Sequence, residues 1–371
     1  MTRAETTDKR WTGLARLAGR RAADTDRTGD IGSEVAEELR GSGLFATMVP
    51  ERHGGSALGL ATLLDLAEDV GAACGSTGWI ASNITSHAWL VALFPDRGQR
   101  EVWEDPRSGV ASVFRMQGEA ERHGEEVIIR SAEGRFCSGV DVADWIVIGL
   151  PVSDAHGSEQ QFLLVHRSEV TTRDDWHVMG LRGTGSRSID LREVRVPARR
   201  VLASADVASG SSPGGATSPS ALHRLPFPAV APFGIAGPVV GIAQAAVGAA
   251  KHALKLNGDA DTVGPALDAF GAAAARIAGA RALLRSHADQ IDQLTPSERL
   301  QPAQVAMVSR DIAFAVQEMR TAVEELFHVA GGSSVHVSSA LQRCWRDISA
   351  AAQHVAFSRA AFARWSRSQI G

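Results

Sequence analysis

The hydrophobic period of the chain changes twice, and this change constrains the fold more than any other feature of the sequence. From about residue 31 to residue 106, apolar residues recur at steps of three and four, as on one face of a helix. From about residue 110 to residue 201, short runs rich in Val and Ile are separated by Gly, Asp and Ser, a pattern typical of strands. From about residue 235 the helical period returns and continues to the end. The sequence therefore predicts helices, then a β domain, then helices.

These changes predict three folded parts and one connection. We expect an α+β molecule with an N-terminal helical domain at residues 1–108, a central β domain at residues 109–205 and a C-terminal helical bundle at residues 231–371. Residues 206–230 are rich in Ser, Gly and Pro and are interpreted as a loop or linker. A chain of 371 residues has ample material for such a core.

Charge and cysteine usage exclude several classes of protein. The chain has 38 basic and 42 acidic residues, a net charge of −4, which does not indicate a nucleic-acid binder. Cys74, Cys137 and Cys344 are odd in number and widely spaced, so they predict neither a disulfide framework nor a cysteine metal site. The first 30 residues lack an apolar signal core, so we expect a cytoplasmic protein. The uncharged residues 228–250 are interpreted as a buried helix rather than a membrane span.

Several common catalytic motifs are absent. The sequence has no P-loop, no His-Glu-x-x-His and no Cys-x-x-Cys. Gly180, Gly183 and Gly185 match a dinucleotide loop superficially, but they precede a strand rather than open a helix. The Gly-x-Ser-x-Gly match at residues 210–214 lies in the linker, whereas a nucleophile elbow joins a strand to a helix. The chain also has no Tyr, which removes one candidate general acid.

An ordered set of motifs resembles the acyl-CoA dehydrogenase superfamily over roughly residues 30–360. The motifs are Gly43-Leu44-Phe45 with Val49-Pro50 and Gly54-Gly55, then residues 175–186 with Val194-Arg195-Val196-Pro197, and then Gly331-Gly332-Ser333 with residues 341–347. The resemblance implies a β-barrel or β-sandwich between an N-terminal helical domain and a C-terminal four-helix bundle. It also implies a homotetramer with flavin bound at a subunit boundary.

Two chemistries compete within that superfamily. The dehydrogenases use a Glu base, but this chain has no Glu after Glu325 and none between Glu193 and Glu298. The chain is more similar to the reduced-flavin-dependent monooxygenases, the oxygenase halves of two-component systems such as 4-hydroxyphenylacetate hydroxylase. The segments that carry this resemblance are residues 74–79, Ser86-His87-Ala88-Trp89, residues 93–95, residues 101–103, Phe136-Cys137-Ser138-Gly139, Ala143-Asp144-Trp145 and residues 351–356.

The resemblance implies a role for four candidate catalytic residues. His87 resembles a histidine that faces the substrate and could deprotonate it, and Ser112 resembles a hydroxyl on the substrate side. Ser138 resembles the serine that meets the flavin near N5. His354 resembles the histidine near the flavin C4a edge, where it could promote a C4a-hydroperoxyflavin.

Further residues resemble the walls of the flavin site. Trp145 and Trp89 resemble its aromatic walls, and Gly139 follows Ser138 in the Ser-Gly segment. Thr184 and Ser186 belong to a turn that we expect to shape the flavin region. We expect no metal. At residues 123–136 the sequence departs from the branch by its Glu and Arg content, and we interpret this segment as a surface hairpin.

The function implied is that of an oxygenase component. It would use FMNH2 or FADH2 from a separate reductase, together with O2, to hydroxylate an aromatic or polycyclic small molecule. The dry, donor-rich pocket that such chemistry needs is the protein's contribution, while the cofactor supplies the oxygen chemistry. Three alternatives stay open: an acyl-CoA dehydrogenase with a displaced base, an amine N-oxygenase, and a catalytically inactive member of the fold.

Overall fold

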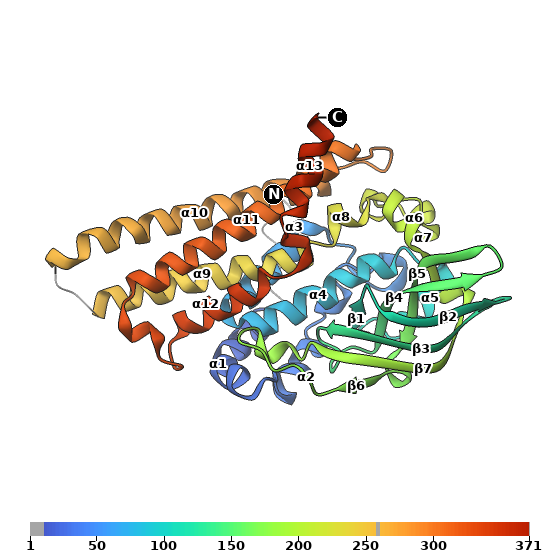
Figure 1. Ribbon diagram of the computed structural model, residues 1–371, viewed down its shortest axis with the longest axis horizontal. Coiled ribbons are helices and arrows are strands. Elements are labelled where there is room, and N and C mark those ends of the chain that lie inside the picture. The colour runs from blue at the N-terminus through green and yellow to red at the C-terminus, as the bar shows by residue number, and fades with distance from the viewer. Residues whose placement is uncertain (1–10, 257–259, 371) are drawn as a thin grey trace.

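Helices occupy both ends of the chain and one sheet occupies the middle (Figure 1). The computed structural model describes residues 11–256 and 260–370. Residues 1–10, part of the stretch in which we expected no export signal, lie outside the described residues. The predicted order of helical, β and helical parts is confirmed.

The N-terminal part is built around one central helix, α4. Its helices are α1 (Thr12–Thr28), α2 (Ser33–Gly41), α3 (Leu60–Ala73), α4 (Gly75–Val91) and α5 (Asp96–Val102). Almost every residue of α4 is buried, because α3, the C-terminal helices and the sheet all pack against it. A polar side chain on such a helix has to find its partners inside the protein, since water does not reach it.

The strands form an eight-stranded sheet that is mostly antiparallel. They are β1 (Val110–Val113), β2 (Gln117–His123), β3 (Glu126–Cys137), β4 (Trp145–Asp154), β5 (Gly157–His166), β6 (Thr171–Arg173), β7 (Arg187–Pro197) and β8 (Val201–Ala203). The strand order is β6-β7-β3-β2-β4-β5-β8, and β1 pairs in parallel with β4. Residues 123–136, interpreted above as a surface hairpin, form the turn and second strand of the β2–β3 hairpin.

A left-handed residue explains why the alternation of β7 is only approximate. The β3–β7 register is the same on both sides of Glu193, with Ile129 opposite Val194 and Ser131 opposite Arg192. Glu193 itself has a φ of +51°, and this left-handed conformation shifts the next buried residue by one position. Ile189 and Leu191 before Glu193, and Val194 after it, therefore all face the core of the β domain.

Short helices fill the segment interpreted as a linker. They are α6 (Ser204–Ser209), α7 (Pro213–Thr217) and α8 (Phe227–Val230). Ser212 begins α7, because its hydroxyl accepts the Gly215 N–H and Pro213 takes the first helical position. The Gly-x-Ser-x-Gly match is thus part of a helix cap.

The C-terminal part is the predicted four-helix bundle, followed by a short last helix. The bundle consists of α9 (Phe233–Leu256), α10 (Ala260–Asp292), α11 (Pro302–Val329) and α12 (Ala340–Ala351), and α13 (Ala360–Ile370) follows. The three long helices lie side by side, with α12 packed on α9 and α11 (Figure 1).

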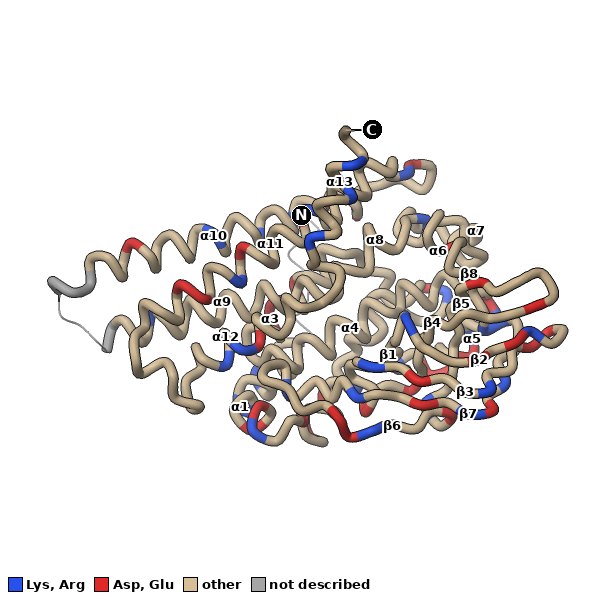
Figure 2. The backbone as a smooth tube through the Cα atoms, viewed as in Figure 1, with Lys and Arg blue, Asp and Glu red and all other residues tan. Residues whose placement is uncertain are grey.

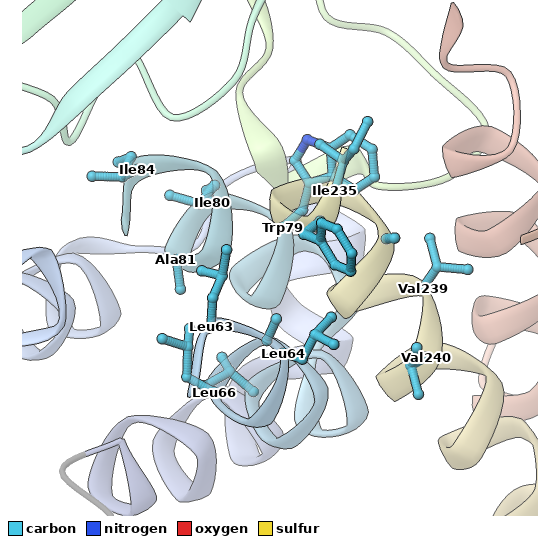
Figure 3. Close-up of a cluster of buried hydrophobic side chains, with 14 of the residues drawn as sticks. Leu63, Leu64, Leu66, Trp79, Ile80, Ala81, Ile84, Ile235, Val239 and Val240 are labelled. Carbon is cyan, nitrogen blue, oxygen red and sulfur yellow. The ribbon is translucent and has the colours of Figure 1, made fainter. Parts of the chain in front are cut away.

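The core between the N-terminal part and the bundle depends on close helix packing. Apolar side chains of α3, α4 and α9 interdigitate there (Figure 3): Leu63, Leu64, Leu66, Trp79, Ile80, Ala81, Ile84, Ile235, Val239 and Val240. A Cβ at Gly78 would lie 2.4 Å from the Gly71 Cα, so α3 and α4 touch backbone to backbone. Only glycine permits this approach.

Charged residues lie mostly away from this core. Figure 2 shows many of them along the strands of the sheet, whereas α9 is nearly free of charge. The stretch Phe227–Leu254 is long and apolar enough to cross a membrane, with a mean hydropathy of 1.6, but 78% of it is buried within the fold. We therefore interpret it as a core helix, as the sequence predicted.

Candidate active site

A histidine and a serine meet where α4 faces the first strand. His87 of α4 places Nδ1 2.8 Å from the Val110 carbonyl oxygen and Nε2 3.0 Å from the Ser112 hydroxyl of β1. A carbonyl oxygen only accepts, so Nδ1 carries the ring proton and Nε2 accepts from Ser112. The fold thus fixes one tautomer of His87 and aims its basic nitrogen at a half-buried hydroxyl.

Burial keeps His87 neutral. Loss of hydration lowers the pKa of His87 to about 4, and the hydrogen bond with the Val110 carbonyl opposes this shift. At pH 7 the ring is therefore a neutral acceptor toward Ser112, and the pair carries no net charge.

Phenylalanines form a wall beside this pair. Phe114 lies edge-on to His87, with ring centroids 5.9 Å apart. The same ring contacts Phe227 of α8 at 5.0 Å and Phe162 of β5 at 5.9 Å. Ser112 lies in β1, and Phe114 follows directly after the strand. Both contact His87, which places a hydroxyl next to an apolar, aromatic surface. We call Phe114, Phe162 and Phe227 the phenylalanine wall.

A second cluster, the Ser138 group, consists of Trp79, Ser138, Thr184 and Ser186. The Trp79 indole N–H donates to the Ser138 hydroxyl at 3.2 Å. The Ser138 and Ser186 hydroxyl oxygens lie 2.7 Å apart, and those of Ser186 and Thr184 also lie 2.7 Å apart. Ser138 is half-buried, so one side of its hydroxyl remains open.

His354 adjoins this group across Trp79. Its ring centroid lies 6.3 Å from that of Trp79 and 5.8 Å from that of Phe357. Nδ1 accepts the backbone N–H of Ala356 at 3.2 Å, so Nε2 carries the proton of the neutral ring. The side chain reaches solvent, yet enough protein surrounds it that desolvation lowers its pKa to about 4.

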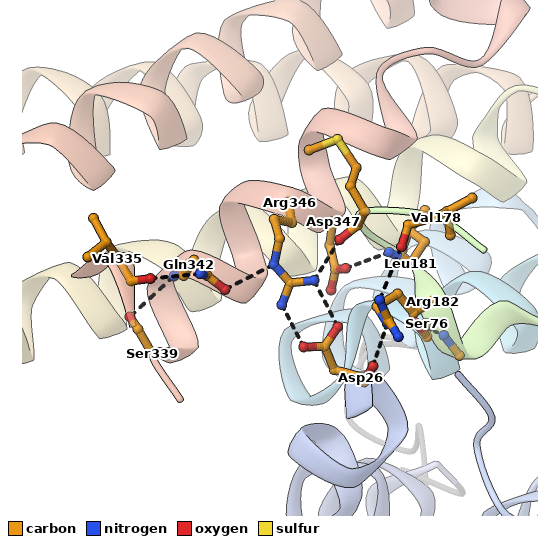
Figure 4. Close-up of polar contacts among 12 residues, drawn as sticks. Asp26, Ser76, Val178, Leu181, Arg182, Val335, Ser339, Gln342, Arg346 and Asp347 are labelled. Atoms are coloured by element: carbon orange, nitrogen blue, oxygen red, sulfur yellow. Dashed lines mark hydrogen bonds and ion pairs between the residues drawn. The ribbon is translucent and has the colours of Figure 1, made fainter. Parts of the chain in front are cut away.

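The turn that carries Thr184 is held by hydrogen bonds to three distant elements (Figure 4). Asp347 of α12 accepts the Leu181 N–H at 2.6 Å, and Ser76 of α4 accepts the Gly183 N–H at 3.1 Å. Arg182 donates to the backbone oxygen of Asp26 in α1 at 2.7 Å. These contacts stabilise Leu181 in a left-handed conformation, φ +53°, that a leucine rarely adopts.

One ion pair locks α12 to α1 at the same place. Arg346 of α12 lies 2.5 Å from the Asp26 carboxylate, and both side chains are mostly buried. Arg346 also donates to the Met179 carbonyl oxygen at 2.6 Å, just before the turn (Figure 4). The C-terminal bundle, the N-terminal helices and the sheet are therefore joined around the Ser138 group.

Helix α4 contributes one residue to each cluster, Trp79 to the Ser138 group and His87 to the pair with Ser112. Trp79 and His87 are eight residues apart, about 12 Å along a helix. A cavity of about 230 Å³ lies beside the Ser138 group, next to Gly139 and the turn of residues 183–185. Its remaining walls come from Ile80 of α4, residues 30–36 of the α1–α2 connection, Asp141 and Val142.

The residues present fit a flavin better than a metal. Among the described residues, no cluster of three His, Cys, Asp or Glu side chains could hold a metal ion. The Ser138 group instead offers an indole, uncharged hydroxyls and close backbone at Gly139, which suit a neutral heteroaromatic ring with polar edges.

The other predicted flavin-wall residues make packing contacts. The Trp89 indole donates to the Leu222 carbonyl oxygen at 2.8 Å and its side chain is fully buried. Trp145 lies under the Arg200 guanidinium, 4.7 Å from the ring centre, and against His166. Their assignment to the flavin site stays a prediction.

Sequence reasoning did not single out Trp79 or the phenylalanine wall. Trp79 lies at the end of the segment 74–79 that carried the family resemblance, so its position was marked although its role was not. The wall joins Phe114, just after β1, with residues of β5 and α8, which are far apart in sequence. No local pattern could bring them together before the fold was known.

Comparison with known proteins decides the family. The model of the acyl-CoA dehydrogenase N-terminal domain matches residues 14–106, and that of the acyl-CoA dehydrogenase C-terminal domain matches residues 233–359. The chain belongs to the acyl-CoA dehydrogenase family. The predicted family is thereby confirmed. One family model matches the sequence before the strands, and the other matches the sequence after them.

Individual relatives place the chain in the monooxygenase branch of the acyl-CoA dehydrogenase family. The flavin-dependent monooxygenase oxygenase subunit HsaA of Mycobacterium tuberculosis is 29% identical over 346 residues, 91% of this chain and 88% of the relative. The oxygenase component of the FADH2-dependent resorcinol hydroxylase of a Rhizobium species is 29% identical over 370 residues, 92% of this chain and 88% of the relative. The crystal structure of 3-HSA hydroxylase from Rhodococcus sp. RHA1 superposes with a TM-score of 0.92 at 27% identity, covering 98% of this chain and 96% of that chain.

Proposed function

We propose that the chain is the oxygenase component of a two-component monooxygenase that hydroxylates an aromatic small molecule. The observation that carries this proposal is the His87–Ser112 hydrogen bond beside the phenylalanine wall. A neutral base behind a hydroxyl, next to an aromatic surface, suits a substrate with a flat ring and a phenolic hydroxyl. Two relatives support this proposal. HsaA is named as an oxygenase subunit, and the resorcinol hydroxylase relative is named as an oxygenase component.

Reduced flavin, FMNH2 or FADH2, would come from a separate reductase, because the relatives are named as one part of a larger system. When bound, it supplies the two electrons that activate O2. Overall, the reduced flavin, O2 and an aromatic C–H give oxidised flavin, water and a phenol. Trp79, Ser138 and His354 would hold the cofactor, with Ser138 toward N5 and His354 presenting its Nε2 proton.

His87 and Ser112 would orient and polarise the substrate hydroxyl. A phenolic hydroxyl would donate to the Ser112 oxygen, while Ser112 donates to Nε2 of the neutral His87 along the 3.0 Å hydrogen bond. Polarisation of the phenolic O–H would make the ring more nucleophilic. Burial of His87 keeps water from competing for the Ser112 proton.

The glutamates of helix α11 do not favour the dehydrogenase alternative. Glu325 and Glu318 of α11 both pair with Arg276, and Glu324 pairs with Arg320. Each of these glutamates is partly exposed and engaged by an arginine, so none resembles a buried base poised for an α-proton.

We further propose that the protein is a cytoplasmic homotetramer. Exposed apolar side chains at both ends of α12 support association surfaces: Val335 and Val337 precede the helix, and Val355 follows it. A subunit boundary at Val355 would also adjoin His354, which directly precedes it.

The test is a reaction with chemically reduced flavin and no reductase. Protein is mixed anaerobically with FMNH2 or FADH2 and then with aerated resorcinol, and product mass, hydrogen peroxide and flavin absorbance are followed. We expect a phenol that is one oxygen heavier than the substrate, with ¹⁸O from ¹⁸O2. Flavin oxidation that yields only peroxide with every phenol in a panel would contradict the proposal.

A further inference from the structure

Three hydroxyl groups form one unbranched hydrogen-bond chain that ends on a backbone carbonyl. Ser138 contacts Ser186 at 2.7 Å, Ser186 contacts Thr184 at 2.7 Å, and Thr184 contacts the Leu181 carbonyl oxygen at 2.9 Å. Thr184 and Ser186 are fully buried, at 1% and 4% exposure. Water therefore cannot reach these hydroxyls to change the direction of their hydrogen bonds.

The direction of every proton in the chain follows from its end. A carbonyl oxygen donates nothing, so the Thr184 proton points at Leu181. That carbonyl also accepts the Trp176 indole N–H at 3.1 Å and the Thr184 N–H at 3.2 Å, which does not change this direction. Ser186 must then donate to Thr184, and Ser138 must donate to Ser186. Three contacts use three protons.

Ser138 is left as an acceptor on its open side. Its own proton points at Ser186, and the Trp79 indole N–H donates into one of its lone pairs at 3.2 Å. What remains for a bound ligand is a lone pair of the Ser138 oxygen. A ligand atom that carries hydrogen is attracted to it, and a ligand atom with a lone pair is repelled.

We propose that Thr184 and Ser186 are positioning residues that make Ser138 an obligate acceptor, so that the site favours reduced over oxidised flavin. This inference rests on the proposed function, in which Ser138 faces flavin N5. N5 of a reduced flavin carries hydrogen and donates, whereas N5 of an oxidised flavin has a lone pair and accepts. Because the buried hydroxyls fix Ser138 as an acceptor, Ser138 would bind N5 of the reduced flavin and repel N5 of the oxidised flavin.

The turn around Leu181 keeps the end of the chain in place. Asp347 accepts the Leu181 N–H, and this anchors the carbonyl on which the chain ends. Without a fixed terminal acceptor the three protons could reverse together, and Ser138 would become a donor. The polarity of the site therefore depends on the terminal acceptor as well as on the hydroxyls.

The test compares the affinities of the two redox states. Oxidised and anaerobically reduced FMN, or FAD where it binds more tightly, are titrated into the full-length protein, and the ratio of the two dissociation constants is measured. Thr184→Val and Ser186→Ala should each lower the preference for the reduced form by about three- to tenfold, the worth of one hydrogen bond. Thr184→Ser, which keeps the hydroxyl, should retain the wild-type ratio.

A second measurement needs no variant. In 5-deazaflavin a carbon replaces N5, so neither redox state can donate or accept there. The wild-type protein should lose its preference for the reduced form with this analogue. A preference that persists with 5-deazaflavin, or equal ratios for Thr184→Val and Thr184→Ser, would overturn the inference.

The two proposals fail in different ways. If the wild-type protein hydroxylates phenols but binds both redox states equally, the inferred direction of the hydrogen bonds is wrong, whereas the proposed monooxygenase function is retained. If it binds neither redox state, the proposed function fails and takes this inference with it. Melting temperatures of the variants identify any loss of binding that comes from unfolding.

Discussion

His87 and Ser112 depend on each other, because each satisfies the other inside an apolar region. The Ser112 proton points at His87 Nε2, so toward any further group the Ser112 oxygen can act only as an acceptor. The low pKa of His87, about 4, keeps this arrangement intact across the neutral range. The pair differs in this respect from a surface histidine, which would be partly protonated near pH 6.5.

Ser112→Ala should therefore lower the rate of product formation much more than the rate of flavin oxidation. We expect about a 100-fold fall in hydroxylation, the usual scale of proton-transfer catalysis. Flavin oxidation should continue and release hydrogen peroxide instead. The product-to-peroxide ratio measures this, with Ser112→Thr as the variant that keeps the hydroxyl. If Ser112→Ala still converted reduced flavin and O2 into hydroxylated product without releasing more peroxide, the serine would be only a packing residue.

Asp347 should make the stability of the protein depend on pH. Burial raises the pKa of Asp347 to about 6 from 3.8, against the lowering effect of the Leu181 N–H. The folded state then holds this proton more tightly than the unfolded state, so stability falls as pH rises from about 4 to about 6. Asp347→Asn keeps an oxygen acceptor and removes the titration.

The stability of Asp347→Asn relative to wild type should thus increase with pH, by about 3 kcal/mol between pH 4 and pH 7. Urea unfolding at a series of pH values gives this difference directly. Parallel stability curves for the two proteins would mean that the carboxyl of Asp347 titrates normally in the fold.

Residue roles could be predicted only where a motif marks them. His87, Ser112, Ser138 and His354 were proposed from family resemblance, and the structure brings His87 to Ser112. Trp79 was missed because an indole in a buried helix has the same sequence signal whether it packs or binds. The orientation of the Ser138 proton depends on the Leu181 carbonyl, 43 residues away, and no local pattern encodes it.

At the scale of elements, the helices of the core are held at a distance that only small residues permit. A Cβ on Gly78 would meet the backbone of Gly71 at 2.4 Å, and neither helix can move without displacing α9. This contact also sets where α4 lies, and hence where it presents Trp79 and His87.

Gly78→Ala should accordingly destabilise the protein by about 3 kcal/mol or more, because backbone cannot yield as a side chain does. Gly279→Ala is the matched control: it lies on the exposed side of α10 with no atom within 4 Å of the added Cβ. The control should be neutral or stabilise by about 0.5–1 kcal/mol. Chemical denaturation of both variants checks the difference, and equal effects would contradict the close-packing account.

Element types were predictable from periodicity, and the exceptions have local causes. The helical and strand segments have the predicted order, since burial on one face leaves a period in the sequence. Glu193 breaks the alternation of β7, because its left-handed conformation, φ +51°, shifts the buried positions by one residue. The short helices of residues 204–230 were not predicted, since caps such as Ser212 and packing, rather than propensity, stabilise them.

At the scale of the whole molecule, the exposed valines that flank α12 require an explanation. Val337, before the helix, is 84% exposed, and Val355, after it, is 73% exposed. Large apolar side chains with such exposure are typical of contacts between subunits. The homotetramer proposed above would cover them.

Analytical ultracentrifugation should therefore give four times the 39.2 kDa mass of one chain. Val337→Asp should shift the equilibrium toward smaller species, because a charge buried in an interface is costly. Gln117→Asp, which adds the same charge at the exposed first residue of β2, serves as the control. A monomer of wild-type protein at micromolar concentration would contradict the assembly.

Asp347 and His354 come from the C-terminal part of the molecule, although the turn and the helix that they contact come far earlier in the sequence. The N-terminal helices and the sheet cannot complete this region by themselves, because the Leu181 N–H and the Trp79 ring depend on these two later residues for their partners. The surroundings of Ser138 therefore form only when all three parts of the fold have come together.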